Sequence, residues 1–153
     1  MRLNEPVAEI RRTRAVAAEP QAIWNVLADF GAISGWSDKV DHSCLLSPKA
    51  QDLGVSTTRR VQVGRNTLVE RITEFDPPST LAYDVEGFPR WLRVNNRWTL
   101  TPSASATAVS LVSTITVAGP LGRIVEGVVT PACVKTLDGL LTGLARKLEG
   151  HRV

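Results

Sequence analysis

The sequence contains little cysteine and little histidine, two residues of each in a chain of 153. Cys44 and Cys133 lie far apart and form no CxxC motif, and neither has a histidine at the spacing of a metal site. This scarcity argues against a structural metal, a disulfide scaffold and a histidine-dependent catalytic triad. We therefore expect no metal and no cofactor, and we expect both cysteines to be buried as small apolar side chains.

Long apolar runs are also absent. No stretch approaches the roughly 18 apolar residues of a membrane-spanning helix, and no apolar run follows basic residues near the start of the sequence. The net charge is only +3, and the basic residues are scattered rather than clustered. We therefore expect a cytoplasmic protein that neither spans a membrane nor binds nucleic acid.

The composition that remains is that of an ordinary globular protein, with 43% hydrophobic and 22% charged residues. The length suits one domain, so we expect residues 1–153 to form a single unit. The apolar pattern predicts a strand over residues 7–18 and then a helix from Pro20, a residue suited to the first helical position. Gly31 is placed to end this helix, and a second short turn is expected near Trp36.

Between residues 40 and 118 the pattern changes to short alternating segments separated by turns, which is typical of an antiparallel meander. The expected strands are 40–46, 54–63, 67–75, 80–87, 91–101 and 106–118. From Pro120 the apolar residues return to helical spacing and predict a long amphipathic helix, bent or interrupted at Pro131. The predicted fold is therefore α+β, with a long C-terminal helix covering a curved antiparallel sheet.

Alternation along the strands predicts which side chains face the C-terminal helix. The inward positions expected on this basis include Val55, Arg59, Val61, Val63, Leu68, Glu70, Ile72, Tyr83, Val85, Asn96 and Ser113. The polar residues in this set allow two interpretations. Either Arg59 and Glu70 form a buried ion pair in a solid core, or the polar groups line a partly hydrated cavity. A β-bulge would instead turn Arg71 inward.

Several segments together resemble one known family. They are IWNVLADF followed by Trp36, VERITEFDPPSTLAY, NNRWTLTP and the long C-terminal helix. Over about residues 7–148 the chain is similar to the START-like (SRPBCC) superfamily, and within it to bacterial polyketide cyclase/dehydrase and lipid-transport-like proteins. The resemblance implies the helix-grip, or Bet v 1-like, fold. In this fold a seven-stranded curved antiparallel sheet wraps around the C-terminal helix, and one or two short helices follow the first strand.

The resemblance also implies a cavity between sheet and helix that binds a small hydrophobic ligand. By position, the cavity glutamate of related hormone receptors matches Glu70, whereas the cavity arginine of related aromatase/cyclases would match Arg71. The two relatives thus disagree by one residue, and strand alternation favours Glu70. The helix positions that contact ligand in such receptors fall near Val129, Ala132, Cys133 and Thr136.

We therefore expect a monomeric or homodimeric protein that binds or transports a small hydrophobic ligand such as a lipid, a polyketide or an aromatic compound. The expected ligand-binding residues are Val61, Val63, Leu68, Glu70, Ile72, Tyr83, Val85, Trp91, Asn96, Val129, Ala132, Cys133 and Thr136. One alternative is an aromatase-like polyketide cyclase/dehydrase in which Glu70 acts as the base and Arg59 or Tyr83 stabilises the enolate or donates a proton. Another alternative is a protein-interaction module.

Overall fold

A computed structural model describes residues 8–46, 53–119 and 122–150 of the chain. The strands are β1 (Ala8–Val16), β2 (His42–Leu45), β3 (Thr58–Val63), β4 (Asn66–Asp76), β5 (Thr80–Glu86), β6 (Leu92–Ser103) and β7 (Ala106–Val117). The helices are α1 (Pro20–Ala28), the 3-10 helix η1 (Phe30–Gly35) and α2 (Gly122–Glu149). The seven strands and the position of each helix confirm the predicted order of elements.

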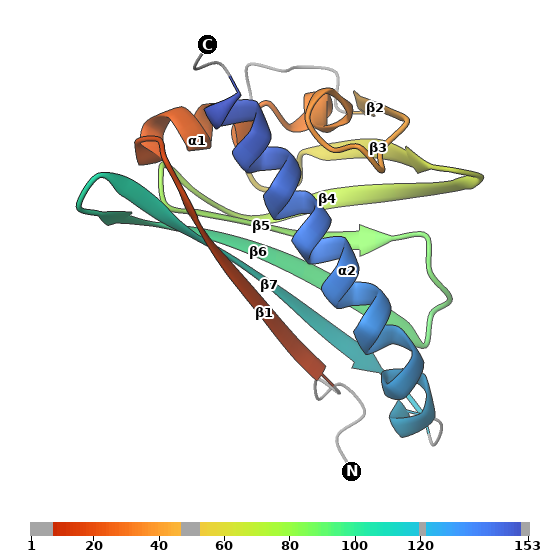
Figure 1. Cartoon of the computed structure of the whole chain (residues 1–153). Helices are drawn as coiled ribbons and strands as arrows, with labels where there is room; N and C mark the ends of the chain where they lie inside the picture. Colours follow the sequence, from red (N-terminus) through yellow and green to blue (C-terminus); the bar gives the residue numbers. More distant parts are fainter. Residues whose placement is uncertain (1–7, 47–52, 120–121, 151–153) are drawn as a thin grey trace.

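All seven strands form one antiparallel sheet in the order β1-β7-β6-β5-β4-β3-β2. Strands β2 to β7 pair with their neighbours in sequence, whereas β1 pairs with β7 and so lies beside the last strand. The long helix α2 crosses one face of the sheet diagonally, and α1 and η1 lie at one end of it (Figure 1). This arrangement confirms the helix-grip fold.

The start of β3 differs from the prediction, which placed a strand over residues 54–63. Residues before Thr58 form a turn, in which Thr57 donates its N–H to the Gly54 carbonyl at 3.1 Å and Ser56 has a positive φ of 78°. Strand alternation cannot extend through such a turn. Val55, predicted to face inward, is consequently 63% exposed, and that prediction was wrong.

The prediction that both cysteines are buried was wrong for Cys44, which is exposed, whereas Cys133 is half-buried. Cys44 pairs with Arg60 in the sheet, and both point away from the helices. Its neighbour Ser43 faces η1 and donates its hydroxyl to the Gly31 carbonyl at 2.7 Å. Ser43 and Leu45 therefore form the inward face of this four-residue strand, since Leu45 packs against Gly31.

Helix α2 continues without a break through Pro131, where we expected a bend or an interruption. Near its C-terminal end, a Cβ on Gly143 would overlap the carbonyl oxygen of Trp36. Glycine therefore lets the helix approach the segment after η1 very closely.

No helix in the described ranges is long and apolar enough to cross a membrane.

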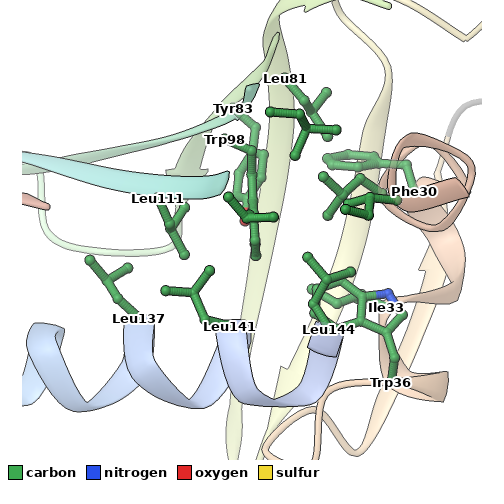
Figure 2. Packing of buried hydrophobic residues seen from close by; sticks show 14 of the residues in the cluster. Phe30, Ile33, Trp36, Leu81, Tyr83, Trp98, Leu111, Leu137, Leu141 and Leu144 are labelled. Carbon is green, nitrogen blue, oxygen red and sulfur yellow. The ribbon is translucent and has the colours of Figure 1, made fainter. Parts of the chain in front are cut away.

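The core lies between the sheet, the C-terminal half of α2 and the short helices. Figure 2 shows leucines of α2, among them Leu141 and Leu144, pointing toward Tyr83 and Trp98 of the sheet. Trp36 and Trp98 meet edge to face with ring centroids 6.1 Å apart. Such packing of large side chains supplies most of the hydrophobic stabilisation of a domain of this size.

Candidate functional site

A cavity of about 670 Å³ lies between the sheet and residues 129–140 of α2. Five consecutive strands, β3 to β7, contribute inward side chains to it, and most of these side chains are apolar. Its volume falls within the range of about 300–1,000 Å³ that is usual for small-molecule sites. The interior thus offers a mainly hydrophobic environment of the size of a small organic molecule.

Most of the residues that the sequence predicted as ligand contacts line this cavity. They are Val61, Val63, Leu68, Glu70, Tyr83, Val85, Asn96, Val129, Ala132, Cys133 and Thr136. Ile72 does not line it, because this residue lies farther along β4, fully buried in the solid core. Trp91 does not line it either, since its side chain, in the loop before β6, is 45% exposed.

Glu70 faces the cavity and Arg71 faces the opposite side of the sheet. The register between β4 and β5 is regular from Val69 to Ile72, and the irregularity in pairing comes only after Ile72. Alternation therefore holds at Glu70. Arg71 is exposed and lies 3.5 Å from the carboxylate of Glu86 on the outer face.

Arg59 is buried behind Glu70 and does not line the cavity. Its Nε and Nη2 atoms each lie 2.7 Å from Oε1 of Glu70, and its Nη1 donates to the Phe30 carbonyl at 2.8 Å. The guanidinium also stacks on the rings of Phe30 and Tyr83, at 3.8 and 4.8 Å from their centroids. The buried ion pair and the cavity, considered as alternatives from the sequence, thus exist together.

This pairing determines the electrostatics of the cavity interior. The charge of Glu70 is balanced by Arg59, and both contacts of the pair use the same carboxylate oxygen, Oε1. Oε2 has no hydrogen-bond partner among the described residues. The interior therefore carries no net charge, but it retains a hydrogen-bond acceptor beside the cavity.

A row of polar side chains crosses the sheet inside the cavity. Tyr83, Asn96 and Ser113 lie directly opposite one another on β5, β6 and β7, and all three line the cavity and are buried. Trp98 donates its indole N–H to the Tyr83 hydroxyl at 3.3 Å. In contrast, Oδ1 of Asn96 and Oγ of Ser113 have no partner among the described residues. A buried polar atom left without a partner costs about 1–3 kcal/mol.

Two titratable groups of the cavity, Tyr83 and Cys133, stay in their neutral forms near neutral pH. Burial, and then the charge of Glu70, raise the pKa of Tyr83, so its hydroxyl keeps its proton. Burial also raises the pKa of the Cys133 thiol, which lies beside the Ser113 hydroxyl. Within the described ranges no group of three or more His, Cys, Asp or Glu residues could hold a metal ion. The cavity is therefore suited to hydrogen bonding rather than to thiolate or phenolate chemistry.

Strand alternation could not predict the residues that loops bring to the cavity mouth. These residues include Lys39 before β2 and Arg65 in the β3–β4 turn. Gly64 beside Arg65 indicates a turn but not which of its residues lines the cavity, and the residues next to Lys39 give no such signal. Ser113 was predicted to face inward but was not among the expected ligand contacts.

The chain matches the family model described as "Polyketide cyclase / dehydrase and lipid transport" over residues 7–149. No curated protein matches the sequence.

Among solved structures, the chain is similar to a START superfamily protein from Mycobacterium smegmatis, with 16% identity and a TM-score of 0.73 over 93% of this chain and 97% of that one. It is also similar to the Zhui aromatase/cyclase from Streptomyces sp. R1128, with 19% identity and a TM-score of 0.68 over 92% of this chain and 94% of that one. The di-domain aromatase/cyclase StfQ of the steffimycin pathway matches at 12% identity and a TM-score of 0.76, over 94% of this chain and 51% of StfQ. These likenesses show the fold, and the family model covers nearly the whole sequence. The chain therefore belongs to the polyketide cyclase/dehydrase and lipid transport family.

Proposed function

We propose that this protein binds a small, largely apolar molecule in the cavity and holds one hydroxyl or similar group of that molecule against the polar row. The observation that carries this proposal is the pair of buried atoms, Oδ1 of Asn96 and Oγ of Ser113, that have no hydrogen-bond partner among the described residues in a mainly apolar cavity. A ligand hydroxyl can donate to the first atom and accept from the second. These two hydrogen bonds would fix the orientation of the hydroxyl in the cavity.

The apolar lining supplies affinity and the polar row supplies orientation. Burial of apolar ligand surface contributes about 25 cal/mol per Å² before the costs of association. The hydrogen bonds discriminate more strongly, because a ligand without the hydroxyl leaves the same buried atoms unpaired. We therefore expect selectivity between ligands that differ only in this group.

Displacement of the neutral fluorescent probe N-phenylnaphthylamine tests this function. Naphthol and methylnaphthalene have similar shapes and differ in one hydroxyl, so we expect both to displace the probe and naphthol to bind roughly tenfold more tightly. If the probe does not bind, or if neither compound displaces it, the proposal fails.

A variant that fills the cavity supplies the matched control. Ala132 is solvent-accessible on α2 and lines the cavity, so Ala132→Trp should place a large ring in the mouth without disturbing the core. Ala22 is exposed on α1 and does not line the cavity. Ala132→Trp should abolish probe binding and Ala22→Trp should not.

A cyclase/dehydrase activity is the second candidate, supported by the free Oε2 of Glu70 beside the cavity and by the structural similarity to two aromatase/cyclases. In that activity the Glu70 carboxylate would remove a proton from a bound poly-β-ketone, and the protonated Tyr83 hydroxyl would donate a hydrogen bond to the enolate. The ion pair with Arg59 opposes this role, because it stabilises the carboxylate that must accept the proton. Turnover of a polyketide that is lost in Glu70→Gln with binding retained would favour the enzyme.

A further inference from the structure

The charged side chains in the cavity lining leave an excess of positive charge at its mouth. They are Lys39, Arg65 and Glu70. Glu70 lies inside and is neutralised by Arg59. Lys39 and Arg65 lie at the rim, both are exposed, and neither forms an ion pair with any described residue. The lining therefore has two uncompensated positive charges, and both are at its mouth.

The fold brings these two cations to the same part of the rim. Asp41 follows Lys39 and ties this segment to β3 and the β3–β4 turn, since its N–H donates to the Gln62 carbonyl at 2.8 Å. Its carboxylate accepts the N–H of Gly64 at 2.8 Å, and Gly64 immediately precedes Arg65. Two hydrogen bonds thus hold the segments that carry the cations side by side.

The side chain of Lys39 lies close to a glycine of α2. A Cβ on Gly139 would lie 3.8 Å from Cε of Lys39, so the lysine stem extends over the helix where no side chain stands. The lysine stem thus packs against α2 at the part of the helix that lines the cavity.

Nearby acidic groups are engaged elsewhere. Asp38, next to Lys39, lies 2.7 Å from Nη1 of Arg146. Asp138, next to Gly139 on the helix, accepts a hydrogen bond from Nε of Arg12 at 2.7 Å. Asp41 does not line the cavity and bonds the Gly64 N–H. Asp38 and Asp138 are thus paired with arginines. Asp41, which keeps its charge, forms no ion pair with Lys39 or Arg65, so both cations can bind an anion from outside the protein.

We propose that the physiological ligand is an anionic amphiphile whose head group, a carboxylate or a phosphate ester, rests between Lys39 and Arg65, while its largely apolar body fills the cavity and places its hydroxyl against the polar row. This inference rests on the proposed function and adds the charge and orientation of the ligand. An anion at the rim keeps much of its hydration and gains from two cations, whereas an anion inside would lose its hydration. A cationic amphiphile would meet repulsion at the same place.

Four ligands with the same alkyl chain test this inference by displacement of N-phenylnaphthylamine: laurate, lauryl phosphate, lauryl alcohol and laurylamine. At low salt we expect both anions to bind roughly five- to tenfold more tightly than the alcohol, and the amine to bind most weakly. The advantage of the anions should shrink as salt is added, because exposed charges are screened. The tighter of the two anions identifies the head group.

The double variant Lys39→Gln/Arg65→Gln should remove the preference for anions and leave the affinity for lauryl alcohol unchanged. Arg60→Gln is the matched control, because Arg60 is exposed on the outer face of β3 and does not line the cavity. Equal binding of acid and alcohol by the wild type, or an anion preference that survives the double variant, would overturn the inference while the proposed function stands. If no compound of the series displaces the probe, the proposed function itself fails.

Discussion

The space between α2 and the sheet is filled at one end and hollow at the other, although the same strands border both ends. At the filled end, β6 contributes Trp98 and β7 contributes Leu111, which are paired across the sheet and fully buried. The next inward-facing pair on these strands lies two residues away from Trp98 and Leu111. It consists of Asn96 and Ser113, and both line the cavity. The change from large apolar to small polar side chains creates the volume that a ligand can occupy.

The helix shows the same contrast over one turn. Gly143 lies against the Trp36 carbonyl with no room for a Cβ, whereas Gly139 borders the cavity and has ordinary space around it. Polar groups follow the contrast as well, since the Trp98 indole N–H is hydrogen-bonded and Oδ1 of Asn96 is not. The filled end therefore stabilises the protein, and the hollow end carries the binding capacity.

The largest expected effect concerns the filled end. Trp98→Ala removes a side chain that is 1% exposed and should lower the free energy of unfolding by about 3–5 kcal/mol. Trp91→Ala, at the exposed tryptophan before β6, should change it by less than about 0.5 kcal/mol. Urea denaturation of both variants measures the difference. Similar losses of unfolding free energy for the two variants would contradict the contrast between the filled end and the cavity.

The next largest effect concerns the two glycines of α2, because alanine at these positions should change the stability of the protein in opposite directions. Gly143→Ala forces a shift against the Trp36 backbone and should destabilise the protein by about 1–3 kcal/mol. Gly139→Ala meets only ordinary contacts and should stabilise it by up to about 1 kcal/mol, because alanine favours the helix. Thermal unfolding of the pair is the measurement. Stabilisation by Gly143→Ala would show that the helix does not approach η1 so closely.

A smaller effect should appear at high pH. Burial raises the pKa of Tyr83 above the value of 10.0 that it has in the unfolded chain. Above that pH the unfolded state loses the proton while the folded state keeps it, so stability falls by up to about 1.4 kcal/mol per pH unit until the folded pKa is reached. Below pH 10 this contribution is fully present. Tyr83→Phe should therefore have a shallower decline in alkaline denaturation than the wild type, and parallel curves would exclude the mechanism.

The contrast between the two ends also explains what could be predicted from the sequence. Strand alternation identified the inward faces of Glu70, Asn96 and Val85, because these residues lie in regular strands. Alternation does not tell how far along a strand a cavity extends, and so Ile72 was placed at the ligand although it lies in the solid core. Strand alternation also gives no prediction where the chain leaves the strand and turns.

Turns and loops account for the remaining differences. The positive φ of Ser56 ended the strand that was expected to include Val55. Lys39 and Arg65 reach the mouth through loops that hydrogen bonds of Asp41 hold together, and these contacts involve residues distant in sequence. Local patterns therefore predicted the fold and the sheet lining, while the mouth of the cavity depends on tertiary contacts.

The most direct test of the account is the substitution Asn96→Leu, followed by unfolding and ligand binding. Leucine has a similar size and removes both polar atoms of the amide, the unpaired Oδ1 and the group that bonds Tyr83, so we expect the free energy of unfolding to stay within about 1 kcal/mol of the wild type. In the same variant the affinity for naphthol should fall to that for methylnaphthalene. A less stable variant that binds naphthol as tightly as the wild type would show that Asn96 supports the fold and not the ligand, and would contradict the account.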